Sequence, residues 1–102
     1  GNTRLGSYSL VQGGCRFIKD IPPYIIAGRE PIAYSGINII GLRRRGFSNE
    51  LIENIHNTYR IIYNSGKNVS DALQQIREEI TMTPEIEYIV SFIENSERGI
   101  IR

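Results

Sequence analysis

The sequence has few of the residues that disulfides, metal centres and histidine catalysis require. Cys15 is the only cysteine, which excludes an intrachain disulfide and a thiolate metal site. His56 is the only histidine, so any histidine-based proton transfer within this chain would have to use it. We therefore expect neither a metal site nor a cofactor.

A large excess of one charge is also lacking. The 12 Lys and Arg residues against 11 Asp and Glu residues leave a formal net charge of +1. This balance gives no electrostatic reason to expect a nucleic-acid partner. No apolar run approaches the length of a membrane span, and nothing resembles a signal peptide. With 40% hydrophobic residues, the composition is typical of one soluble domain in a reducing, cytoplasmic compartment.

Residues 1–31 contain a six-residue repeat. Leu5, Val11 and Phe17 are spaced by six positions, with small residues between them. One bulky apolar residue in every six is typical of a parallel β-helix, in which each hexapeptide supplies a short strand and a corner. Coils of this kind bury their apolar faces only by stacking. We therefore expect the last coils of a β-helix, with the faces of these three residues left open.

The stretch Asp-Ile-Pro-Pro-Tyr over residues 20–24 follows the repeat. Successive prolines lack backbone donors and cannot continue a ladder, so this stretch is predicted to stop the β structure. The apolar spacing becomes helical from residue 35. The sequence therefore predicts residual β-helix coils with a proline-rich terminator over 1–34, and a C-terminal helical domain over 35–102.

The helical domain is expected to contain about four helices, which gives an α+β chain. Ser35 is predicted to cap a short helix over roughly Gly36–Arg45, which Gly46 ends. The caps predicted for the three longer helices are Ser48, Asn68 and Thr83, the last of which is followed by a proline. Apolar residues at helical spacing indicate one buried face on each longer helix.

Arg43, Arg44 and Arg45 form the most suggestive polar cluster. Adjacent residues of a helix point about 100° apart, so at most two of the three can converge on one phosphate. One interpretation is an exposed basic face, which the dipole favours at a helix C-terminus. The other is a diphosphate site, because the arginine fork suits two phosphates. The residues alone favour the exposed face.

Four other residues have a structural explanation that competes with a functional one. His56 lies beside an apolar helical stripe without a serine or carboxylate placed for a dyad, so we expect a surface histidine. Cys15 stands where the repeat needs a small residue, and packing accounts for it. Asn68 matches a glycosylation sequon but is expected to cap a helix. Asn38 binds either a ligand or its own backbone.

The segments KDIPPY, AGREP, GINIIGLRRRGF, IIYNSGKN and SERGIIR together resemble the C-terminal part of the UDP-N-acetylglucosamine O-acyltransferases. In that family an acyl carrier protein thioester donates a 3-hydroxyacyl chain to the glucosamine 3-hydroxyl, the first step of lipid A synthesis. The resemblance covers the chain from about Leu5 onward. It implies a left-handed parallel β-helix followed by a small helical domain, assembled as a homotrimer with active sites between subunits.

The resemblance also implies which residues bind substrate. Asn38, Arg44 and Arg45 match positions that line the nucleotide part of the family's site, where the arginines recognise the diphosphate. Arg43 matches a position that is merely basic. Ile40 stands where other members carry an acid for the uridine, which leaves base recognition without its usual partner.

No catalytic residue of the family falls within this chain. The family's general base is a histidine in an earlier coil, and His56 does not occupy its position. The resemblance therefore predicts a C-terminal fragment that lacks acyl transfer of its own. One alternative is another hexapeptide-repeat sugar acyltransferase, for example one that acylates an amino group. A second is a freestanding helical interaction module, which would bind the acidic acyl carrier protein through residues 43–45.

Overall fold

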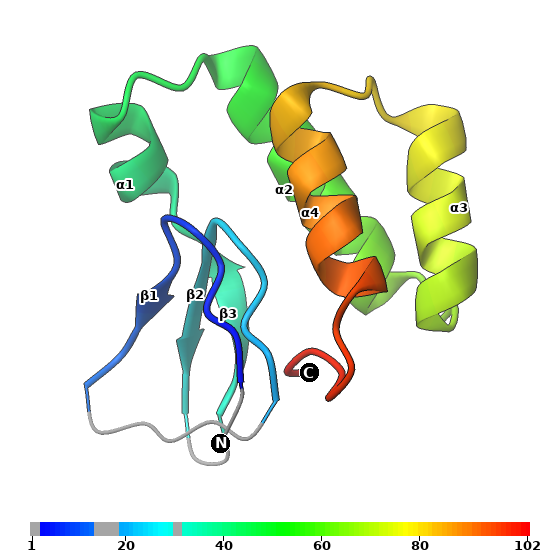
Figure 1. The fold of residues 1–102 in the computed structure, drawn as a ribbon. Helices are drawn as coiled ribbons and strands as arrows, with labels where there is room; N and C mark the ends of the chain where they lie inside the picture. The colour runs from blue at the N-terminus through cyan, green and yellow to red at the C-terminus, as the bar shows by residue number, and fades with distance from the viewer. Residues whose placement is uncertain (1–2, 14–18, 30–31) are drawn as a thin grey trace.

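The computed structural model describes residues 3–13, 19–29 and 32–102, and these residues form three strands and four helices. The strands are β1 (Leu10–Val11), β2 (Ile25–Gly28) and β3 (Ala33–Ile37). The helices are α1 (Ile39–Arg44), α2 (Asn49–Asn64), α3 (Val69–Glu79) and α4 (Pro84–Glu94). The strands lie at one side of the molecule, with α1 beyond their ends and the three longer helices at the other side (Figure 1). Phe17 and Cys15, which the sequence placed in the repeat, lie outside the described residues.

Two segments of the chain, 3–13 and 19–29, stack on each other in parallel. Leu5 bridges Ile21, and β1 pairs with β2 so that Leu10 lies beside Ile26. Each of these pairs is 16 residues apart in the sequence. The Arg4 N–H donates to the side chain of Asp20, which is also 16 residues away. The pairing is the stacking expected of β-helix coils, although the offset is shorter than three full hexads.

The apolar residues of the first coil are only partly covered. Leu5 is 54% exposed, and Val11 is half-buried against the core. In contrast Ile21, which lies under Leu5 in the second coil, is fully buried. The prediction that the open end of the stack exposes its apolar faces is confirmed at Leu5.

The prolines do not stop the β structure, contrary to the sequence prediction. Pro22 and Pro23 form a corner between the bridge at Ile21 and the first residue of β2. A corner needs no ladder donors from these two residues, so the missing N–H groups cost nothing there. The ladder therefore resumes directly after Tyr24.

The start of the short helix also differs from the prediction. Ser35 does not cap it, because residues 33–37 form β3, which pairs antiparallel with β2. Asn38 is the cap, and α1 begins at Ile39. Pairing between distant residues has overridden a local capping signal. The division of the chain into domains at 34/35 stays a prediction.

The three longer helices begin where the sequence predicts. The side chains of Ser48, Asn68 and Thr83 each accept a hydrogen bond from the backbone N–H three residues later. Asn68 thus acts as a helix cap, as expected. None of the helices in the described ranges is long and apolar enough to cross a membrane.

The core joins the coils to the helices. Tyr59 of α2 is fully buried and donates its hydroxyl to the Pro23 carbonyl at 2.6 Å. Tyr63, one turn later, donates to the Ile101 carbonyl at 2.7 Å and stacks on Tyr34 of β3 with ring centroids 4.3 Å apart. The C-terminal tail runs back from α4 to the strands (Figure 1), where Ile100 bridges Asp20. These contacts join α2 to the second coil, to the first half of β3 and to the C-terminal tail.

Candidate functional site

Asn38 sits at the junction between β3 and α1, where three hydrogen bonds orient its backbone N–H and its side-chain amide. Its backbone N–H donates to the Tyr24 carbonyl at 2.7 Å. Its Oδ1 accepts the Gly41 N–H at 3.2 Å, and its Nδ2 donates to the Tyr8 carbonyl at 3.0 Å. A carbonyl can only accept and an N–H can only donate, so these partners fix the orientation of the amide. One amide hydrogen and one oxygen lone pair remain for a ligand.

Gly41 makes room for this arrangement. A Cβ atom at this position would lie 2.8 Å from Cγ of Asn38, closer than side-chain carbons pack. The Asn38 side chain cannot move aside without losing its bonds to Gly41 and Tyr8. The glycine is therefore part of what positions the amide.

The three arginines that follow are all exposed, and they face different surroundings. Arg44 lines the same hollow as Asn38. The guanidinium carbon of Arg45 lies 4.7 Å from the centre of the Tyr8 ring. Arg43 lines a separate hollow together with Glu53 and His56.

The end of α1 explains this divergence. Arg43 and Arg44 are in its last turn, and Arg45 is its C-cap. The N–H groups of Gly46 and Phe47 then bond back to the carbonyls of Arg43 and Leu42, which closes the helix at the predicted glycine.

The hollow beside Asn38 and Arg44 is mainly apolar and measures about 630 Å³. Its apolar lining comes from β1, β2, the end of β3 and the first turn of α1: Leu10, Ile26, Ile37, Ile39 and Ile40. Ile40 is 68% exposed, so an apolar side chain stands open to solvent at the rim. A hollow with an apolar floor, one amide and one guanidinium can hold a ligand that has a flat or apolar part and an anionic part.

The other candidates have structural roles. His56 lies exposed on α2, which confirms the prediction of a surface histidine. Among residues 3–13, 19–29 and 32–102, no cluster of three or more His, Cys, Asp and Glu side chains could hold a metal ion.

The Tyr24 hydroxyl, near this site, stays protonated because burial, followed by the charge of Glu85, raises its pKa.

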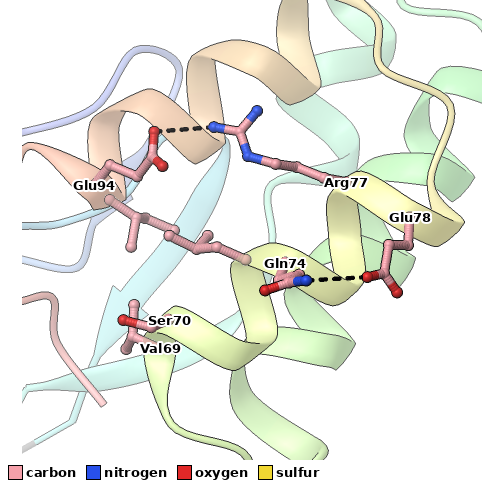
Figure 2. Close-up of a pocket in the computed structure, with 8 residues that line it drawn as sticks. Val69, Ser70, Gln74, Arg77, Glu78 and Glu94 are labelled. Carbon is pink, nitrogen blue, oxygen red and sulfur yellow. Dashed lines mark hydrogen bonds and ion pairs between the residues drawn. The ribbon is translucent and has the colours of Figure 1, made fainter.

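A second hollow of about 720 Å³, which no sequence motif predicts, lies between α3 and α4. Figure 2 shows Arg77 reaching from α3 to Glu94 of α4, at 3.0 Å. Glu87 lies 3.6 Å from the same guanidinium. Arg77 is therefore already paired with two carboxylates near solvent, and Glu78 accepts a hydrogen bond from Gln74, so this lining offers no free cation for an anionic ligand.

Tyr8 is the residue of the site that sequence reasoning missed. Its carbonyl holds Asn38, and its ring lies under Arg45. The signal was present in the sequence, because Tyr8 and Tyr24 occupy equivalent places in the two stacked coils. Both have left-handed backbone angles, with φ of 58° and 71°. A repeat search at the observed offset would have aligned them.

Stacked parallel coils followed by a small helical unit, with an amide and two guanidiniums at their junction, define the C-terminal part of a β-helix protein. A family sequence model described as UDP-N-acetylglucosamine O-acyltransferase, domain 2, matches residues 20–101. The chain therefore belongs to the UDP-N-acetylglucosamine O-acyltransferase family, in agreement with the resemblance of its motifs.

Individual relatives agree with this assignment. The crystal structure of the UDP-N-acetylglucosamine acyltransferase from Bacteroides fragilis 9343 is 76% identical, with a TM-score of 0.98, over 99% of this chain and 40% of that one. The protein from Acinetobacter baumannii gives 37% identity and a TM-score of 0.93 over the same shares. The acyl-[acyl-carrier-protein]–UDP-N-acetylglucosamine O-acyltransferase of Syntrophobacter fumaroxidans is 39% identical over 95% of this chain and 38% of its own length.

These matches confirm the predicted fold class, the last coils of a left-handed parallel β-helix followed by a small helical domain. The chain spans about two-fifths of the length of the relatives that it matches.

Proposed function

We propose that this chain is the C-terminal part of a cytoplasmic acyltransferase that moves a 3-hydroxyacyl group from acyl carrier protein to UDP-N-acetylglucosamine. The observation that carries the proposal is the 76% identity and TM-score of 0.98 to the Bacteroides fragilis acyltransferase across nearly the whole chain. The curated relatives carry the donor and the acceptor in their names. A homotrimer follows from the family resemblance.

In the proposed reaction the 3-hydroxyl oxygen of the sugar attacks the thioester carbonyl. A C–O bond forms, the C–S bond breaks, the hydroxyl proton passes to a general base, and the carrier thiol leaves. The base that the family uses belongs to an earlier coil. The exposed His56 lies on α2, in a hollow separate from that of Asn38 and Arg44, so it is not proposed as the base.

The role proposed for the chain itself is to bind the nucleotide. Arg44 is an exposed cation that lines the hollow of Asn38, and Arg45 is an exposed cation over the ring of Tyr8, whose carbonyl holds the Asn38 amide. Guanidiniums bind diphosphate through paired, charge-assisted hydrogen bonds. Asn38 keeps one donor and one acceptor free for the ligand. Ile40 offers the base an apolar contact, where other members carry an acid.

The test is an acyl transfer assay with purified acyl carrier protein thioester and UDP-N-acetylglucosamine. The complete protein that carries this sequence should turn over, and the 102-residue chain should not. Without a positioned base the rate falls by about 10²–10⁴. Turnover by the short chain that disappears in His56→Ala would reject the assignment of the chemistry to an earlier coil. An inactive complete protein would reject the proposed reaction.

A further inference from the structure

Tyr8 holds an unusual position for a large aromatic residue. It lies at the corner before β1, is 41% exposed, and has a φ of 58°, which glycine or asparagine adopts more readily. Tyr24 has the same backbone conformation one coil later, but its side chain is only 4% exposed. The corner geometry therefore explains the backbone of both residues and leaves the exposed ring of Tyr8 unexplained.

The backbone carbonyls of the two corners, at Tyr8 and Tyr24, both accept hydrogen bonds from Asn38. The Tyr24 carbonyl accepts the Asn38 backbone N–H at 2.7 Å, and the Tyr8 carbonyl accepts its side-chain Nδ2 at 3.0 Å. Stacking of the corners sets both carbonyls, since Tyr24 in turn donates its N–H to Ser7 at 2.9 Å. The amide of Asn38 is thus oriented by the coils as well as by its own helix.

The ring of Tyr8 supports the other end of α1. The Arg45 guanidinium lies over it at 4.7 Å, within the range of a cation–π contact. The ring itself is held by Tyr24, stacked at 6.0 Å and 20°, and by the edge of Phe47 at 6.0 Å. A flexible arginine at an exposed helix end thereby rests on a fixed aromatic surface.

We propose that Tyr8 is a positioning residue that presets Asn38 and Arg45 for the diphosphate of the nucleotide sugar. This inference rests on the proposed function. Holding an arginine near its bound rotamer before the ligand arrives lowers the ordering cost of binding. A cation–π contact at an exposed site corresponds to about two- to fivefold in affinity.

The test compares UDP and uridine binding by calorimetry in the complete acyltransferase. Tyr8→Asn removes the ring but tolerates the left-handed backbone and keeps the carbonyl. We expect it to weaken UDP binding about two- to fivefold and to leave uridine binding unchanged. Tyr8→Phe keeps the ring and should bind UDP like the wild type. Phe92→Leu is the matched control and should leave UDP affinity unchanged, because the Phe92 ring joins this aromatic cluster through Tyr88 and not through Tyr8.

Two further measurements separate positioning from folding. In the Arg45→Ala background, Tyr8→Asn should cause no further loss of UDP affinity, because the ring then has no guanidinium to hold. With the complete enzyme, Tyr8→Asn should raise KM for the nucleotide sugar and leave kcat within about twofold.

The results that would contradict the positioning role of Tyr8 differ from those that would contradict the proposed function. If Arg45→Ala weakens UDP binding and Tyr8→Asn does not, the positioning role is rejected and the nucleotide site stands. If Tyr8→Asn weakens uridine as much as UDP, or its effect adds fully to that of Arg45→Ala, the ring acts only through folding and the inference is also rejected. If the wild type binds no UDP, the proposed function fails and the inference fails with it.

Discussion

The Ser96 hydroxyl donates a hydrogen bond of 2.6 Å to Oδ2 of Asp20, a carboxylate that is only 1% exposed and 76 residues away in the sequence. The other carboxylate oxygen accepts the Arg4 N–H at 2.7 Å. A buried carboxylate is tolerated when hydrogen bonds replace its lost hydration. Asp20 therefore ties the first coil and the segment after α4 to one point of the second coil.

Ser96→Ala should lower the free energy of unfolding by about 1–3 kcal/mol, because it leaves one oxygen of a buried carboxylate without a partner. Ser91→Ala is the matched control, since the Ser91 hydroxyl makes only a long, exposed contact of 3.5 Å with Glu87. That change should stay within about 0.5 kcal/mol. Denaturant unfolding of both variants measures the difference. Equal, small losses would show that Asp20 does not depend on Ser96.

The arginine cluster gives a second prediction, for the complete acyltransferase. Arg44→Ala and Arg45→Ala should each weaken nucleotide-sugar binding about ten- to hundredfold, because a hydrogen bond to a charged group contributes about 1.5–3 kcal/mol. Arg43→Ala should change the affinity little, since Arg43 lines a different hollow. Titration calorimetry on the three single variants is the measurement. Small and equal effects at all three positions would favour an exposed basic face without a ligand.

Gly41→Ala should separate stability from binding. Alanine favours a helix over glycine by up to about 1 kcal/mol, but its Cβ displaces the Asn38 side chain. We expect unfolding free energy to change by less than about 1 kcal/mol while nucleotide affinity falls severalfold. Gly13→Ala, where a Cβ meets nothing within 4 Å, is the control and should leave affinity unchanged. Unaltered affinity in Gly41→Ala would remove Asn38 from the nucleotide site.

Alkaline pH should destabilise the fold through Tyr59 and Tyr63. Burial raises the pKa of both hydroxyls above the ordinary value of 10. Above about pH 10 the unfolded chain loses these protons while the folded chain keeps them, so the unfolded state is favoured increasingly as pH rises. Each tyrosine contributes a slope of up to about 1.4 kcal/mol per pH unit.

Denaturant unfolding at several pH values between about 8 and 11 measures how the free energy of unfolding falls with pH, which proton linkage relates to the two tyrosines. Tyr59→Phe should show a shallower alkaline loss, and a lower stability at neutral pH because the Pro23 carbonyl loses its partner. Tyr88→Phe serves as the control, since its hydroxyl makes exposed bonds to Ser7. An unchanged slope in Tyr59→Phe would place the alkaline sensitivity elsewhere.

The helical half of the fold could be predicted because its signals are local. Ser48, Asn68 and Thr83 each cap a helix through a bond within one turn, and a sequence window contains both partners. Ser35 carries the same signal and misleads, because its strand pairs with β2. Pro22 and Pro23 also lead to a wrong prediction, that the β structure stops there. Only the pairing before and after them, at Ile21 and in β2, shows that they form a corner.

The site was predictable only in part. The family resemblance predicts that Asn38, Arg44 and Arg45 bind substrate, and their role in binding stays a prediction. The structure adds that Arg44 shares a hollow with Asn38 and that Arg43 does not. The only sequence signal for Tyr8 is the repeat that aligns it with Tyr24, since its contacts with Asn38 and Arg45 span 30 or more positions. Contacts of that range follow from how the coils stack.

The bridge between Asp20 and Ile100 has a consequence for the order of events during folding. Closing a long loop costs entropy that grows with the logarithm of its length, so contacts between distant residues form after local ones. The tail segment around Ile100 also leaves the ribosome after the coils that it secures. The bridge at Asp20 therefore forms only after Ile100 has been synthesised, and a nascent chain stalled after α4 exposes the apolar surface that Ile100 and Ile101 would cover.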